Sequence, residues 1–131
     1  MRENPSACVL DASALLALLH AEPGADTVER AVDGAAVSTV NWSEVHERAA
    51  ARAVDVAGLR ADLEALGLEI VPFTVDDAER AAALRPATRP LGLSLGDRAC
   101  LALALRLDRP ALTADRSWID LEIGASITSI R

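Results

Sequence analysis

The chain of 131 residues has no lysine, tyrosine or glutamine, and its aromatic residues are one phenylalanine and two tryptophans. Its two cysteines, Cys8 and Cys100, are too few for a disulfide scaffold or a zinc site, and both lie in apolar segments typical of small buried thiols. The apolar run Ala12–Leu19 is far shorter than the roughly 20 residues that span a bilayer, and Met1–Pro5 is charged and broken by proline, unlike an export signal. We therefore expect a soluble cytoplasmic protein with no membrane partner.

Motifs of several enzyme classes are also missing. There is no G-x-S-x-G nucleophile elbow and no glycine-rich phosphate loop. His46 lies two residues from Glu44, so the two side chains diverge on a helix, and no second histidine completes a zinc-binding helix. His20 is expected to be an exposed histidine at the end of the first helix. A haloacid-dehalogenase-type phosphatase would carry an acid two residues after Asp11, where this chain has Ser13.

The net charge is −7, and all 13 basic residues are arginine. An acidic protein is at first sight a poor partner for nucleic acid, because phosphate neutralisation supplies most of the non-specific affinity. That argument weakens if some of the acids hold divalent cations, which make the local field attractive to phosphate. The overall charge therefore does not decide the substrate.

Short apolar segments alternate with amphipathic ones, which predicts strands separated by helices. The expected strands are 7–10, 36–38, 68–72, 111–113 and, at an edge, 127–130. The expected helices are 14–19 with Ser13 as its cap, a short one ending near 32, 41–54, 56–66, 74–84 and 95–107 with Ser94 as its cap. Two prolines and a glycine predict an irregular loop over 85–92. Helical connections require parallel strands, so we predict one α/β domain, residues 1–131, with helices on both faces of its sheet.

Four acids lie where such a sheet collects its ligand-binding groups. Asp11 and Asp115 follow the first and fourth strands, while Glu44 and Asp97 lie in the first turns of helices that begin on the same side. Carboxylates gathered in one cleft repel one another unless a cation compensates, and oxygen ligands favour Mg²⁺ or Mn²⁺. Such a site can generate a hydroxide nucleophile and hydrolyse a phosphodiester.

Each acid also has a structural interpretation, although Asp11 is expected near the core, where an unpaired charge is costly. Ser94 and Asp97 match a capping box, Asn41 and Glu44 resemble one, and Asp115 could begin a turn. The alternative function is therefore a non-catalytic, partner-binding α/β module whose acids are helix caps. Joint occurrence of the four acids favours the catalytic interpretation.

The ordered motifs resemble the PIN-domain ribonucleases, and among them the VapC-type toxins of toxin-antitoxin systems. The resemblance extends over essentially the whole chain. Its motifs are Val9-Leu10-Asp11-Ala12-Ser13, Glu44 after Ser38-Thr39-Val40-Asn41, Leu93-Ser94-Leu95-Gly96-Asp97-Arg98 and Thr113-Ala114-Asp115.

The resemblance implies a three-layer α/β/α sandwich around a mainly parallel five-stranded sheet. It implies that Asp11 and Asp97 are the principal Mg²⁺ ligands, that Glu44 and Asp115 complete the acidic cluster, and that Thr113 is an auxiliary hydrogen-bonding group. It further implies a homodimer that cleaves RNA by metal-activated water, leaving a 5′ phosphate and a 3′ hydroxyl. The implied partner is a VapB-type antitoxin, through which the toxin meets operator DNA only indirectly.

Arginines and tryptophans near these motifs are candidate substrate contacts. Arg85 and Arg89 are expected to reach outward from the 85–92 loop. Arg98 and Arg116, each following a site acid, either contact phosphate or pair with carboxylates. The two tryptophans, Trp42 and Trp118, either stack on a base or pack around the site.

Overall fold

The computed structural model describes residues 7–131, so the Met1–Pro5 segment considered above lies outside the described residues. Its five strands form one sheet in the order β3-β2-β1-β4-β5, with every neighbouring pair parallel. The strands are β1 (Val9–Leu10), β2 (Ala36–Ser38), β3 (Glu69–Val71), β4 (Ala111–Thr113) and β5 (Ile127–Ser129). The predicted parallel sheet and its last edge strand are therefore confirmed.

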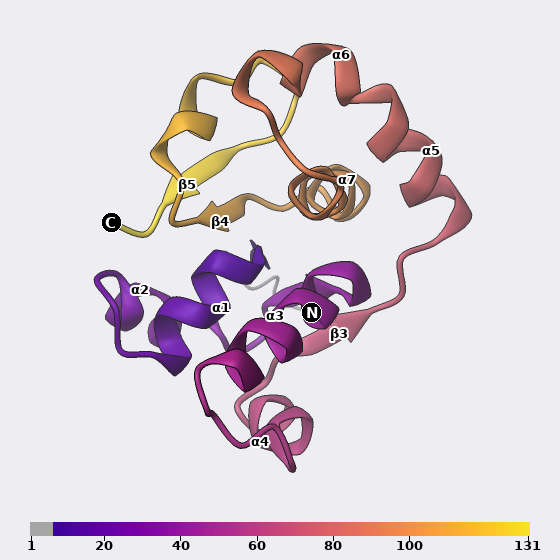
Figure 1. The fold of residues 1–131 in the computed structure, drawn as a ribbon. Helices are drawn as coiled ribbons and strands as arrows, with labels where there is room; N and C mark the ends of the chain where they lie inside the picture. The colour runs from indigo at the N-terminus through magenta and orange to yellow at the C-terminus, as the bar shows by residue number, and fades with distance from the viewer. Residues whose placement is uncertain (1–6) are drawn as a thin grey trace, which may run out of the picture.

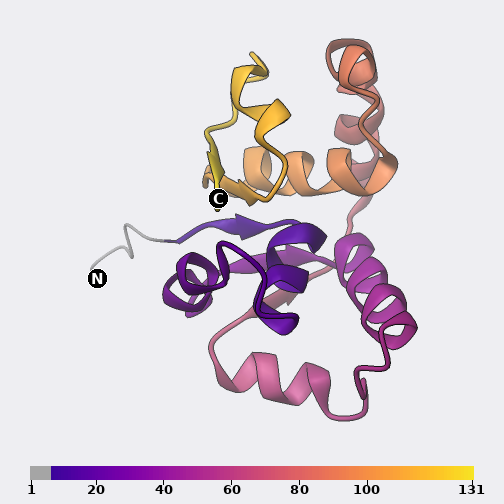
Figure 2. The ribbon, with the colours of Figure 1, turned by 60° about the vertical axis from the view of Figure 1, so that its left-hand side comes forward.

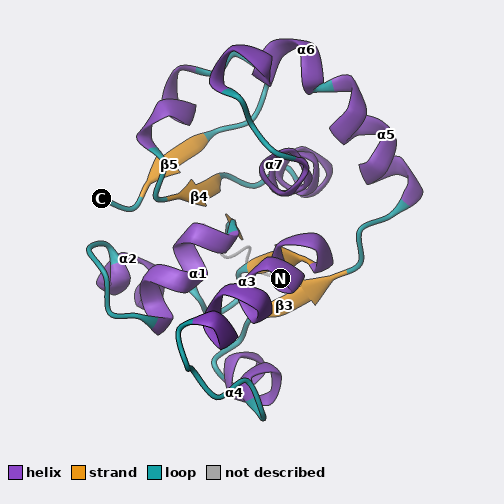
Figure 3. Cartoon of the chain, in the orientation of Figure 1, coloured by secondary structure: helices purple, strands orange, loops and turns teal. Residues whose placement is uncertain are grey.

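Helices cover both faces of the sheet (Figure 1). Turning the molecule shows α7 above the sheet and the first four helices below it (Figure 2), and the strands lie in the middle layer (Figure 3). The helices are α1 (Ala12–Leu19), α2 (Ala25–Ala31), α3 (Thr39–Ala51), α4 (Leu59–Ala65), α5 (Val75–Ala83), α6 (Arg85–Thr88) and α7 (Leu95–Leu107), with short 3-10 turns η1 (Arg89–Leu91) and η2 (Arg116–Asp120). This is the expected three-layer α/β/α sandwich. No helix among residues 7–131 has the length and apolar character required to cross a membrane.

Two apolar cores form because successive strand residues point to opposite faces of the sheet. Leu10 and Leu112 face the core between the sheet and helices α1 and α2. Val9 and Ala111 face the core between the sheet and α7. All four are buried. The sheet is only two or three residues deep at these strands, so polar groups directly after them emerge at its edge.

The chain order places a topological switch at the centre of the sheet. The chain runs from β1 outward to β2 and β3 and then returns to the other side of β1 as β4. Parallel α/β sheets bind ligands outside the carboxyl ends of the strands at such a switch. Asp11 follows β1 and Asp115 follows β4, so both lie at this point.

Several local predictions are wrong. Helix α3 ends at Ala51 rather than near Val54, and α4 begins at Leu59, after Gly58, rather than at Val56. Asp11, rather than Ser13, caps the first helix, since its carboxylate accepts the Ala14 N–H. Helix α3 begins at Thr39 with Ser38 as its cap, two residues before the predicted start. Residues 85–92 are mostly helical because each proline occupies an early position of a short helix, where its missing N–H is not needed.

Candidate active site

Asp11 is a buried carboxylate at the carboxyl end of β1, with 4% of its surface exposed. Its Oδ1 accepts hydrogen bonds from Ala14 N at 2.8 Å and Ser13 Oγ at 2.7 Å, and its Oδ2 accepts one from Thr113 Oγ1 at 2.6 Å. Burial raises the pKa of Asp11 to about 6; these hydrogen bonds oppose the rise, and the negative charge of Asp97 adds to it. The charged form of this side chain is therefore poorly compensated by the protein alone.

Thr113 joins Asp11 to Asp115. Its buried hydroxyl donates to Asp11 and accepts the Asp115 N–H at 3.0 Å. The Asp115 carboxylate itself is exposed and accepts hydrogen bonds from Ser117 N at 2.9 Å and Ser117 Oγ at 2.7 Å. Thr113 thus links the two acids through its hydroxyl, while Asp115 caps the η2 turn.

Glu44 lies in the second turn of α3, which begins earlier than predicted, so it does not cap that helix. Its Oε1 accepts a hydrogen bond from Asn41 Nδ2 at 3.0 Å, and the same amide group donates to the Gly96 carbonyl at 2.9 Å. A Cβ atom at Gly96 would lie 2.7 Å from Glu44 Cδ. The glycine therefore lets the Glu44 carboxylate pack against the first turn of α7.

Asp97 occupies that first turn of α7. It forms the predicted capping box, in which Ser94 N donates to Asp97 Oδ2 at 2.9 Å and Asp97 N donates to Ser94 Oγ at 3.2 Å. The Cys100 thiol lies one turn further on, and its pKa is raised by burial and by the charges of Asp11, Asp97 and Glu44. Glu44 and Asp97 therefore both lie at the first turn of α7, and the charge of Asp97 reaches Asp11.

An ion at this point would have few direct ligands. Within residues 7–131, no three His, Cys, Asp or Glu side chains lie close enough together to hold a metal ion by themselves. The donors are nonetheless suited to Mg²⁺, which takes oxygen ligands and usually keeps several of its waters. A pair such as Asp11 and Asp97, with water completing the coordination shell, fits both the small number of side-chain ligands and the preference of Mg²⁺ for oxygen. Burial raises the pKa of Asp11, and a nearby cation would stabilise its charged form.

A PIN-domain family model matches residues 8–123, which include all four acids. The chain belongs to the PIN-domain family. No curated protein matches it significantly. Among solved structures, this PIN domain is similar to a toxin-antitoxin complex from Klebsiella pneumoniae, with a TM-score of 0.77 and 23% identity over 95% of this chain and 98% of that one.

Two further structures share the fold of this PIN domain. VapBC-5 from Mycobacterium tuberculosis, a member of the VapBC family of toxin-antitoxin systems, matches with a TM-score of 0.55 and 25% identity over 97% of this chain and 99% of that one. VapBC2 from Rickettsia felis, bound to a DNA fragment from its promoter, matches with a TM-score of 0.66 and 13% identity over 94% and 98%. The resemblance to the PIN family seen in the sequence is confirmed.

The candidate substrate arginines of this PIN domain differ in exposure. Arg85 and Arg89 are exposed as expected, although on α6 and η1 rather than on an irregular loop. Arg116 is exposed and donates to the Arg131 carbonyl at 2.8 Å. Arg98 is buried, and its guanidinium donates to the Ala81 carbonyl at 2.9 Å. Arg98 therefore bonds to α5 and is not paired with a carboxylate among residues 7–131.

The tryptophans have packing roles. Trp118 is 1% exposed and belongs to the core beneath α7, so its ring has no free face for a base. Trp42 is partly buried and packs edge-on against His46, with ring centroids 4.8 Å apart. His20, expected to be exposed, is only partly so, and its Nδ1 lies 3.1 Å from Arg52 Nη1.

Sequence reasoning missed three supporting residues. Ser13 donates to Asp11 and accepts the Ala114 N–H at 2.9 Å, which ties α1 to the end of β4. Asn41 holds Glu44, and Gly96 makes room for it. A glycine inside a helix otherwise rich in alanine and leucine costs about 1 kcal/mol relative to alanine. A glycine at this unfavourable position was therefore the one sign in the sequence that another side chain packs closely against residue 96.

Proposed function

We propose that this PIN domain is the toxin of a toxin-antitoxin system and acts as a Mg²⁺-dependent endoribonuclease, for which Mn²⁺ can substitute. The observation that carries the proposal is that the buried Asp11 follows β1 at the switch point of the sheet, while Glu44 and Asp97 both lie at the first turn of α7. The family supports a nuclease, and the similar solved structures are toxin-antitoxin complexes.

Asp11 and Asp97 are the residues that would hold the ion, and Glu44 and Asp115 would contact its waters. A bound divalent cation supplies a Lewis acid that lowers the pKa of water and neutralises charge on a phosphate. Thr113 and Ser13 fix the orientation of Asp11 through their hydrogen bonds. In the proposed hydrolysis a water oxygen bonds to phosphorus and the bond to the 3′ oxygen breaks. The 3′ oxygen takes up a proton, which leaves a 3′ hydroxyl and a 5′ phosphate.

The proposal includes a VapB-type antitoxin as partner, a homodimer and a cytoplasmic location. The antitoxin is supported by the VapBC complexes among the similar structures, one of which is bound to promoter DNA. Any contact with DNA would then pass through the antitoxin. Arg85, Arg89 and Arg116 are the exposed arginines proposed to meet RNA.

The direct test is cleavage of cellular RNA by the purified chain with Mg²⁺ or Mn²⁺. We expect Asp97→Asn to abolish cleavage, because the amide keeps the Ser94 capping interaction but loses the charge. Equal stability of this variant would separate loss of the site from loss of the fold. Full-rate cleavage by a folded Asp97→Asn protein would refute the site assignment.

A second candidate function is a non-catalytic, partner-binding module, which is favoured by the capping hydrogen bonds of three of the acids. Asp11, Asp97 and Asp115 each accept a hydrogen bond at the start of a helix or helical turn. If capping is their whole role, Asp11→Asn and Asp97→Asn leave any growth phenotype unchanged, whereas core substitutions abolish it. Glu44 distinguishes the two candidates, because it caps nothing in this structure.

A further inference from the structure

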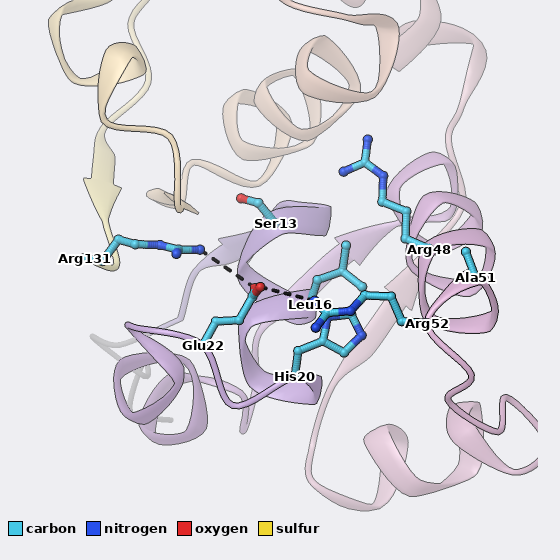
Figure 4. Close-up of a pocket in the computed structure, with 8 residues that line it drawn as sticks. All are labelled: Ser13, Leu16, His20, Glu22, Arg48, Ala51, Arg52 and Arg131. Atoms are coloured by element: carbon cyan, nitrogen blue, oxygen red, sulfur yellow. Dashed lines mark hydrogen bonds and ion pairs between the residues drawn. The ribbon is translucent and has the colours of Figure 1, made fainter.

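A basic pocket of about 380 Å³ lies next to Ser13, between α1, the end of α3 and Arg131, which comes two residues after β5 (Figure 4). Three of the chain's 13 arginines line it, together with His20 and one acid, Glu22. The arginines are Arg48, Arg52 and Arg131. These guanidinium groups are concentrated on an otherwise acidic protein, and the proposed hydrolysis gives them no role.

Two residues connect this pocket to the candidate active site. Ser13 lines the pocket, and its hydroxyl donates to Asp11 at 2.7 Å. Arg48 lines it from α3 and lies 3.8 Å from Glu44 Oε2. A ligand that reaches the acids from this side therefore passes the basic pocket.

Glu22 is the pocket's own anion. Its Oε2 lies 3.4 Å from Arg52 Nη1 and its Oε1 lies 4.0 Å from Arg131 Nη2, so the carboxylate bridges two guanidinium groups (Figure 4). These side chains are between 35% and 59% exposed. Exposed ion pairs of this kind are weak. A competing anion can therefore exchange with Glu22 at little cost.

We propose that this pocket binds a backbone phosphate of the RNA strand, next to the phosphodiester held at the acids. The inference rests on the proposed function and adds to it a subsite for the substrate backbone. Arginine recognises phosphate through paired N–H groups. Arg52 already donates a hydrogen bond to one Glu22 oxygen, and Arg131 lies 4.0 Å from the other. Phosphate displaces Glu22, and the two arginines close on it from α3 and from the end of β5.

The test measures binding of a short, random-sequence single-stranded RNA by fluorescence anisotropy. The protein is the full chain carrying Asp97→Asn, which prevents cleavage. The dissociation constant is followed from about 50 to about 200 mM salt, because each phosphate contact contributes about 0.7 to the logarithmic salt slope for single strands. We expect Arg52→Ala and Arg131→Ala each to weaken binding roughly fivefold and to reduce the slope by about 0.7.

Glu22→Gln is expected to act in the opposite direction. Removing the internal anion frees both arginines, so RNA binds several-fold more tightly and the slope becomes steeper. Arg60→Ala is the matched control: Arg60 is an exposed arginine on α4, paired with Glu64 at 3.3 Å, and does not line the pocket. The same loss of charge there should leave affinity and slope close to those of the parent. Thermal unfolding of each variant checks that the fold is intact.

The outcomes separate this inference from the proposed function. If the wild-type chain cleaves RNA but Arg52→Ala, Arg131→Ala and Arg60→Ala all bind it alike, the subsite is refuted and the nuclease stands. If no RNA is cleaved or bound under any condition, both are refuted. If the two pocket variants bind RNA normally but weaken a complex with a protein partner, the pocket recognises a protein carboxylate and the phosphate subsite is refuted.

Discussion

Replacing Asp11 with asparagine should stabilise the metal-free protein by an amount that depends on pH. Burial raises the pKa of Asp11 from 3.8 to about 6. A group whose pKa is raised by folding stabilises the native state fully below its unfolded pKa, and this stabilisation is lost as pH rises through the folded pKa. The difference between the two pKa values corresponds to about 3 kcal/mol. Asparagine carries no charge at any pH and escapes this loss.

The measurement is urea unfolding of both proteins in the presence of a chelator, from about pH 3 to about pH 7. The free energy of unfolding of Asp11→Asn minus that of the wild type should rise by about 3 kcal/mol over this range. Its value at low pH reflects the altered hydrogen bond with Thr113 and does not affect the slope. A difference that stays flat with pH would show that the Asp11 charge is already compensated and would refute the reasoning.

Three further predictions concern the packing of Glu44, the ion pair between Asp77 and Arg106, and the binding of Mn²⁺. Gly96→Ala should push the Glu44 carboxylate away, since the new Cβ would lie 2.7 Å from Glu44 Cδ. RNA cleavage should fall at least tenfold, while the free energy of unfolding should change by no more than about 1 kcal/mol. In a Glu44→Ala background the same substitution should have no further effect on cleavage. Asp77→Asn should destabilise the protein by about 2 kcal/mol, because the buried Asp77 carboxylate accepts bonds at 2.7 and 3.0 Å from Arg106, whose side chain is 32% exposed. Burial alone would raise the pKa of Asp77, but Arg106 and the hydrogen bonds with Thr74 together lower it. The wild-type advantage should therefore shrink as pH falls, and an advantage that grows would contradict this. Saturating Mn²⁺ should raise the unfolding midpoint of the wild type but not of Asp11→Asn, and equal shifts in a thermal melt would indicate binding elsewhere.

Most of the fold could be predicted from the sequence because its determinants are local. Strand 36–38, helix 95–107 and strand 111–113 occur as expected, since apolar periodicity and the Ser94 cap mark them directly. The errors at 39–41 and 85–92 arose where Ser38 could equally end a strand or cap a helix, and where proline was taken as a break rather than as a helix start.

The candidate site depends on both levels. From the sequence alone, Asp11 and Asp115 could be placed after strands and Asp97 in the first turn of a helix, but Glu44 was placed one turn too early in its helix. The packing of Glu44 against Gly96, the bond from Arg98 to α5 and the lining of one pocket by Arg48, Arg52 and Arg131 appear only in the tertiary structure. Local patterns record backbone preference and burial, whereas side-chain neighbours from distant segments depend on how the layers pack, which no single segment encodes.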